Sequence, residues 1–149
     1  MAERVLAIDY GERRVGLAIS DPETSFVRGL PTLDRRALKE GGLTAAISAL
    51  VAERGVERIL IGVPYSLDGS IGPAAERVLA FRDRLYLTTD VPLDEWDERL
   101  TTEAAKRRLE ELGYSEKQMR GKLDQLSAVL MLELYLRFRE SRGDPETPS

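Results

Sequence analysis

Two short, uninterrupted apolar runs constrain the fold of this chain more than any other feature of its sequence. Residues 4–9 (RVLAID) and 57–64 (ERILIGVP) have the length of a strand, and each is followed by turn-forming residues. A short run without polar alternation is typical of a β-strand covered on both faces. Such strands need helices to cover them, so the two runs predict an α/β fold.

The other segments predict strands and helices in the order β-β-β-α-β-α-β-α-α. The predicted strands cover residues 4–9, 14–20, 26–32, 57–64 and 91–96, with Gly11 in the first turn. The predicted helices cover residues 43–55, 73–87, 101–113 and 123–140, and residues 114–122 are predicted to form a loop despite the capping-box spacing of Ser115 and Gln118. Three antiparallel strands followed by strand–helix alternation predict a mixed five-stranded sheet flanked by helices.

The length of 149 residues fits one domain, predicted at residues 1–139, with a disordered tail at residues 140–149. The first ten residues do not resemble a signal peptide, and no run approaches the roughly 18 apolar residues of a membrane span. We therefore expect a cytoplasmic protein with no membrane association. A net charge of −4 argues against general affinity for nucleic acid but leaves room for a local basic face.

The chain contains neither cysteine nor histidine, which excludes several kinds of chemistry. Disulfides, thiolate zinc sites, thiol nucleophiles and every Ser-His-Asp triad are ruled out. Any hydrolytic chemistry must therefore depend on carboxylates, either alone or together with a hard metal ion bound through oxygen.

Carboxylates stand at the ends of three predicted elements. Asp9 ends the first strand, Asp97 and Glu98 end the last strand, and Asp124 opens the last helix. In an open α/β sheet, functional groups gather at the carboxyl ends of the strands. Carboxylates held together repel one another unless a divalent cation joins them, and two such ions about 3.5–4 Å apart can cleave a phosphodiester.

Each carboxylate also has a structural interpretation. Asp9 suits a D-x-G turn, Asp124 suits a helix N-terminus, and Asp97 with Glu98 suits a solvated strand end. Spacing alone does not decide between a metal site and these separate roles.

Four motifs in order resemble one known family: AIDYGERRVGLAISD, IGVPYSLDGS, DERLTTEAA and GKLDQLSAVLMLELYL. Together they resemble the YqgF family of ribonuclease-H-like bacterial proteins, also described as RuvX-type, Holliday-junction-resolvase-like or pre-16S rRNA nucleases. The resemblance covers about residues 4 to 138. It implies a ribonuclease-H-like fold and a metal-dependent nuclease that cleaves structured nucleic acid near the 5′ end of the small-subunit ribosomal RNA precursor.

The resemblance also implies roles for the acidic residues. Asp9, Glu98 and Asp124 would be the catalytic ligands of two Mg²⁺ or Mn²⁺ ions, with Asp97 as a substitute for its neighbour. Strand alternation would send Asp97 and Glu98 to opposite faces, which favours only one of them as a ligand. The loop motif departs from the family pattern, because Ser66 stands where LPLNMDGS has asparagine.

Basic and loop residues near these acids are candidates for substrate binding. They are Arg13, Arg99, Arg120 and Lys122, which flank site residues, and Ser66, Asp68 and Gly69 in the loop of residues 64–72. The alternatives are solvated charges and an ordinary surface turn. Trp96 and the apolar stripe of the last helix are predicted to lie in the core. The stripe consists of Leu126, Val129, Leu130, Leu134 and Leu136.

Structured RNA, branched DNA or both are the expected partners, and a homodimer is left open. The first alternative function is a Holliday junction resolvase acting on branched DNA. A second is a nucleic-acid-binding module without catalysis, which the presence of all three acidic positions disfavours. A third is phosphotransfer, since DYGERRVG resembles the phosphate turn of actin-like ATPases, but a chain of 149 residues supplies only one of their two lobes.

Overall fold

The computed structural model describes residues 2–141, apart from the side chains of Glu40, Thr102 and residues 119–125. The predicted order of strands and helices is confirmed. The elements are β1 (Val5–Tyr10), β2 (Arg14–Ser20), β3 (Val27–Asp34), α1 (Arg35–Arg54), β4 (Arg58–Val63), α2 (Pro73–Tyr86), β5 (Leu93–Asp97), α3 (Glu98–Glu111) and α4 (Glu116–Ser141).

The five strands form one mixed sheet in the order β3-β2-β1-β4-β5, as predicted. β1 pairs with β2 in antiparallel fashion and with β4 in parallel fashion, and β4 is parallel to β5. The carboxyl ends of β1, β4 and β5 therefore meet at one edge of the sheet. This is the edge where open α/β sheets place their functional groups.

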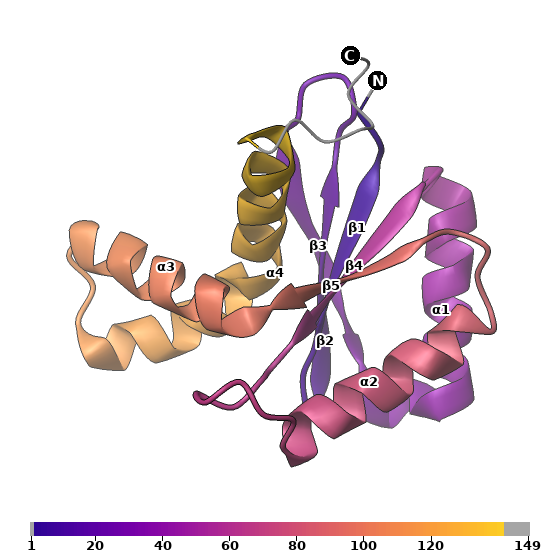
Figure 1. The fold of residues 1–149 in the computed structure, drawn as a ribbon, viewed down its shortest axis with the longest axis horizontal. Coiled ribbons are helices and arrows are strands. Elements are labelled where there is room, and N and C mark those ends of the chain that lie inside the picture. The colour runs from indigo at the N-terminus through magenta and orange to yellow at the C-terminus, as the bar shows by residue number, and fades with distance from the viewer. Residues whose placement is uncertain (1, 142–149) are drawn as a thin grey trace.

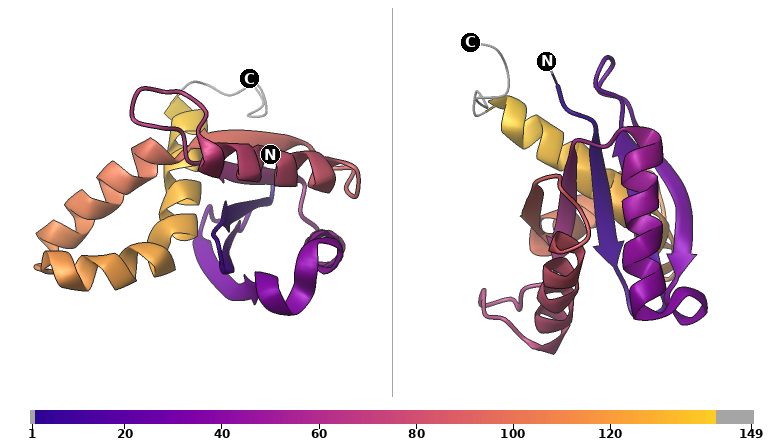
Figure 2. Two further views of the ribbon diagram at one scale, coloured as in Figure 1. Left: turned by 90° about the horizontal axis from the view of Figure 1, so that it is seen from below. Right: turned by 90° about the vertical axis from the view of Figure 1, so that its right-hand side faces the viewer.

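Helices cover both faces of the sheet, α1 and α2 on one side and α4 on the other (Figure 1). Alternate residues of β1 serve the two faces: Leu6 and Ile8 pack with Phe81 of α2, whereas Val5 and Ala7 pack with Met131 of α4. Of the apolar stripe of α4, Val129, Leu134 and Leu136 pack against the second cluster and Leu130 is buried, which confirms the core prediction for these four residues. Figure 2 shows α3 and the first half of α4 extending beyond the sheet.

The starts of three helices differ from the predicted ones. α4 begins at Glu116, so the prediction of a loop over residues 114–122 is wrong. Ser115 and Gln118 form a capping box at its start: the Ser115 hydroxyl accepts from the Gln118 backbone N–H, and the Gln118 side-chain oxygen accepts from the Ser115 backbone N–H. α1 begins at Arg35 behind the cap Asp34, well before the predicted start at residue 43, and it has a break at Lys39.

The third difference concerns α3, which begins at Glu98 with Asp97 as its cap instead of at a threonine.

At the carboxyl end of the described chain, α4 continues to Ser141 and so includes residues 140–141 of the predicted tail. Residues 142–149 lie outside the described part, and the domain boundary stays a prediction. No helix within residues 2–141 combines the length and the apolar content needed to cross a membrane.

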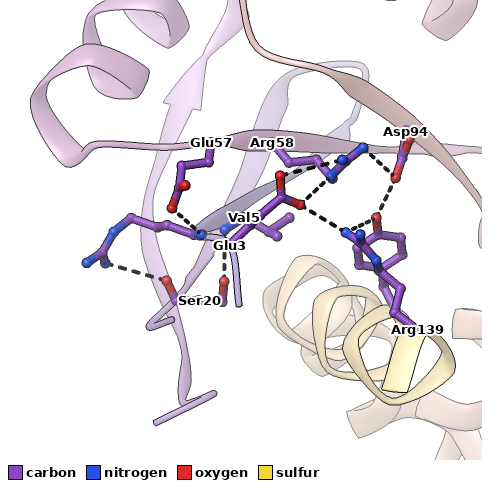
Figure 3. A network of polar contacts seen from close by, with 9 residues as sticks. Glu3, Val5, Ser20, Glu57, Arg58, Asp94 and Arg139 are labelled. Atoms are coloured by element: carbon purple, nitrogen blue, oxygen red, sulfur yellow. Dashed lines mark hydrogen bonds and ion pairs between the residues drawn. The ribbon is translucent and has the colours of Figure 1, made fainter. Parts of the chain in front are cut away.

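A polar network fastens α4 to the end of the sheet opposite Asp9 (Figure 3). Arg58 donates to Glu3 at 2.7 Å and to Asp94 at 3.2 Å, and the hydroxyl of Tyr135 donates to the same Asp94 carboxylate. Arg139 donates to the Tyr135 oxygen at 2.8 Å and to Glu3 at 3.3 Å. Glu3, Arg58 and Asp94 belong to the sheet side of this contact, whereas Tyr135 and Arg139 belong to α4. The network therefore helps to set the position of the helix on the sheet.

Candidate active site

Asp9 lies near the carboxyl end of β1, at a position where the sheet and α4 come close together. It is half-buried, and its register partner on β2 is Gly16. A Cβ atom at Gly16 would lie 3.6 Å from the Cβ of Asp9 and 3.7 Å from the Cβ of Ala128. The strand and its neighbours therefore hold the Asp9 backbone rigidly, as a metal ligand requires.

Glu98 reaches the same place from the first turn of α3, directly after β5. Its side chain passes over Gly62 of β4: a Cβ at Gly62 would lie only 2.6 Å from Oε1 of Glu98 and 2.8 Å from Sδ of Met131. No side chain fits in that space, so Gly62 is the residue that admits the Glu98 carboxylate to the sheet edge.

The two carboxyl groups are in direct contact, because Glu98 and Asp9 share a side-chain hydrogen bond. Burial first, and then the negative charge of Asp9, raises the pKa of Glu98 to about 8. Two ionised carboxylates in this contact are therefore unfavourable unless a cation joins them. Two oxygen-donating acids in a half-buried position are a ligand set that suits a hard divalent ion such as Mg²⁺ or Mn²⁺.

A cleft of about 350 Å³ opens over this pair. Asp9, Glu98 and Glu12 supply acidic groups to its wall, and Arg35 and Arg77 supply basic ones. Ser127 of α4 also lines the cleft. The cleft thus brings together β1, α3 and α4, which contain the three acidic positions predicted from the sequence.

The side chain of Asp124 lies outside the described residues, as do those of Arg120 and Lys122. Within the part of the chain whose side chains are described, no group of three acidic side chains is placed to hold a metal ion. Asp124 precedes Ser127 by three residues, which is about one helical turn. Its role as a third ligand remains a prediction.

Asp97 has a different environment from its neighbour. Its side chain caps α3 by accepting from Arg99 N at 3.0 Å, and it forms an ion pair with the Arg99 guanidinium at 2.6 Å. Hydrogen bonding to Arg99 keeps the pKa of Asp97 below its usual value. β5 ends at Asp97 and α3 begins at Glu98. The two side chains therefore point in different directions because the chain changes from strand to helix between them, and not because of strand alternation.

Arg99 connects this cap to the loop between β4 and α2. Its guanidinium donates to the carbonyl oxygens of Leu67 at 3.1 Å and Ser66 at 3.4 Å. The loop is itself ordered by Asp68, which accepts from both the backbone and the hydroxyl of Ser70, and by Gly69 at a φ of +87°. These hydrogen bonds from Ser70 lower the pKa of Asp68. Arg99 thus holds the loop beside the cleft, whereas Arg13 is exposed in the β1–β2 turn.

Sequence reasoning missed two positions that shape the cleft and the contact between its acids. Gly62 had a signal, since a glycine inside an apolar strand often marks a close approach by another group. Arg35 had no such signal in the sequence, because its place in the cleft depends on how the start of α1 packs against the β1–β2 turn.

Trp96 is buried, as predicted, and its indole N–H donates to the hydroxyl of Thr101 at 2.6 Å.

Solved structures with the same fold include resolvases. The chain superposes on Thermus thermophilus RuvC in complex with Holliday junction substrate with a TM-score of 0.58 and 15% identity, over 95% of this chain and 96% of the other. The fowlpox virus Holliday junction resolvase gives a TM-score of 0.50 and 10% identity over 93% and 98% of the two chains. The fold is that of the ribonuclease-H-like class.

Sequence comparison identifies the family within this class. The model of the RuvX family, described as Holliday junction resolvase, matches residues 3–138. A relative from Acetivibrio thermocellus is 41% identical over 94% of this chain and 97% of its own length, and one from Halothermothrix orenii is 38% identical over 91% and 96%. Both carry the name "Putative pre-16S rRNA nuclease". The chain belongs to the RuvX family and shares its nuclease class.

Proposed function

We propose that this chain is a divalent-metal-dependent nuclease that hydrolyses phosphodiester bonds near the 5′ end of the 16S ribosomal RNA precursor. The contact between Asp9 and Glu98, from elements 89 residues apart in the chain, is the observation that supports this most directly. Two acids brought together at the carboxyl end of a sheet, inside a cleft, have no evident structural use. The names of the relatives support the ribosomal RNA precursor as the substrate.

The residues that would hold the metal are Asp9, Glu98 and Asp124. Bound there, Mg²⁺ or Mn²⁺ would supply Lewis-acid activation of water and stabilisation of the leaving oxygen. Asp9 and Glu98 offer oxygens whose positions are fixed by β1 and by the first turn of α3. Asp97 acts indirectly, by capping α3 and so holding the backbone of Glu98 in place.

The substrate-binding roles predicted for Arg13, Arg99, Arg120, Lys122 and the loop of residues 64–72 remain part of this proposal. For Arg99 we propose that it orders the loop through Ser66 and Leu67, so that Asp68 and Gly69 face the substrate in one conformation. The cytoplasmic location and the homodimer stay predictions.

A cleavage panel tests the proposed function. A 5′-extended RNA carrying the precursor stem and a four-way DNA junction are each incubated with Mg²⁺ or Mn²⁺, with wild type and with Asp9→Asn. We expect wild type to cut the RNA and Asp9→Asn to lose the cleavage while keeping its circular dichroism spectrum. Full activity of Asp9→Asn would remove Asp9 from the mechanism. Cleavage of the junction alone would establish the branched-DNA alternative instead.

A further inference from the structure

We propose that a basic groove at the start of α1, formed by Arg35, Arg36 and Lys39, binds the phosphate backbone of the substrate beyond the scissile bond. This inference rests on the proposed function and adds to it a second contact region on the protein. The ligand is defined by its chemistry: consecutive phosphodiesters of a nucleic acid strand. None of the three residues belongs to the motifs from which site residues were predicted.

The groove adjoins the active-site cleft, because two residues line both. It has a volume of about 290 Å³ and is lined by Glu12, Arg35, Arg36, Lys39 and Leu43. Glu12 and Arg35 also line the cleft that contains Asp9 and Glu98. A strand whose scissile phosphate lies at the carboxylates can therefore continue past the β1–β2 turn into the groove.

Arg35 is fixed at the boundary between the two cavities. Its guanidinium lies 4.2 Å from the ring centroid of Tyr10 and donates to the carbonyl oxygens of Gly11 at 2.9 Å and Glu12 at 3.0 Å. Tyr10 in turn stacks on Phe81 with ring centroids 4.4 Å apart. A cation held in this way loses little conformational entropy when an anion binds.

Arg36 and Lys39 provide the exposed cations of the groove. Asp34 accepts a hydrogen bond from Arg36 N at 2.9 Å, which fixes the backbone and leaves the Arg36 side chain exposed. Lys39 has a φ of 56°, a left-handed conformation that is unfavourable for a residue other than glycine. Within the described part of the chain, neither side chain forms an ion pair with a carboxylate.

The charge of the groove contrasts with that of the whole chain. Among the side chains that the structure describes, three cations and one acid, Glu12, line the groove, in a protein whose net charge is −4. Local positive charge on an acidic background attracts a polyanion to one place rather than to the whole surface. The three basic residues therefore lie beside the cleft and have the charge that suits a sugar–phosphate backbone.

The experiment compares Arg36→Gln/Lys39→Gln with the matched control Arg28→Gln/Arg54→Gln. The control removes the same charge from exposed residues: Arg28 lies toward the opposite end of the sheet from Asp9, and Arg54 ends α1. Steady-state cleavage is measured on the precursor-stem RNA and on the DNA junction over a range of salt concentrations. For whichever substrate is cut, we expect the groove variant to raise KM at least about tenfold with kcat unchanged. The slope of log kcat/KM against log salt should fall by about 1.5, since two phosphate contacts are lost.

Substrates with single neutral methylphosphonate linkages provide a second readout. A methylphosphonate at a phosphate that contacts the groove should raise the KM of wild type. The same linkage should leave the KM of the groove variant unchanged, because that variant has already lost the contact. A groove variant with the KM and salt slope of wild type, or one that matches the control, overturns this inference while cleavage by wild type leaves the proposed function intact. If wild type cuts neither substrate, the proposed function itself fails.

Discussion

At the residue scale, Gly62 stands where the site leaves no room for a side chain. The space that its side chain would occupy is taken by the Glu98 carboxylate and the sulfur of Met131. We expect Gly62→Ala to displace Glu98 from Asp9 and to lower the cleavage rate about 100-fold, since a misplacement of about 1 Å has that effect on a catalytic group. Gly41→Ala, where a Cβ meets no atom within 4 Å, is the matched control. Equal activity of the two variants would show that Glu98 does not need its present position.

The raised pKa of Glu98 gives a second prediction at this scale. In metal-free protein the folded state keeps the proton on Glu98 until about pH 8, whereas the unfolded chain loses it near the ordinary value of 4.5. The folded state binds more protons in this window, so its stability falls as the pH rises through it. Relative to Glu98→Gln, we expect the free energy of unfolding of wild type in EDTA to fall between about pH 5 and about pH 8. Urea denaturation at both pH values measures this, and a constant difference between the two proteins would contradict it.

At the element scale, the position of α4 decides whether its acidic residue can reach the cleft. The network of Glu3, Arg58, Asp94, Tyr135 and Arg139 fastens the far end of this helix to the sheet (Figure 3). Burial, together with the hydrogen bond to Asp94, raises the pKa of the Tyr135 hydroxyl, so it remains a donor at all ordinary pH values.

We therefore expect Tyr135→Phe to lower the free energy of unfolding by about 1 kcal/mol, because loss of the hydroxyl removes one hydrogen-bond partner from Asp94 and one from Arg139. Tyr86→Phe is the control, since Tyr86 is exposed. Urea denaturation checks both variants. Indistinguishable midpoints and slopes for the two would mean that the network does not stabilise the helix.

The elements were largely predictable from the sequence, and the exceptions have physical reasons. The strands were predictable because their apolar runs are bounded by turn residues. The start of α4 was missed because residues 114–122 are mostly polar in sequence and include Gly121, so that the Ser115–Gln118 capping box was the main signal for a helix. The first half of α4 extends beyond the sheet (Figure 2). The start of α1 was missed because Gly41 and Gly42 indicated a break before residue 43, although Asp34 is a typical helix-capping residue and does cap α1.

At the scale of the whole molecule, topology explains how distant residues meet. Parallel pairing of β1, β4 and β5 brings Asp9, Gly62 and the start of α3 to the same edge. The acidic positions could be proposed from the sequence and from its resemblance to a family. The contact of Glu98 with Gly62 and the link from Arg99 to Leu67 could not, since both depend on side-chain paths through space.

The most direct measurement of the central claim is a calorimetric titration of the metal-free protein with Mn²⁺. The claim is that Asp9, Glu98 and Asp124 form one coordination site, so we expect wild type to bind two ions per chain and each of Asp9→Asn, Glu98→Gln and Asp124→Asn to lose at least one. Glu23→Gln, an exposed acid beyond β2, should bind as wild type does. Two ions bound by Asp9→Asn with the affinity of wild type would contradict the account.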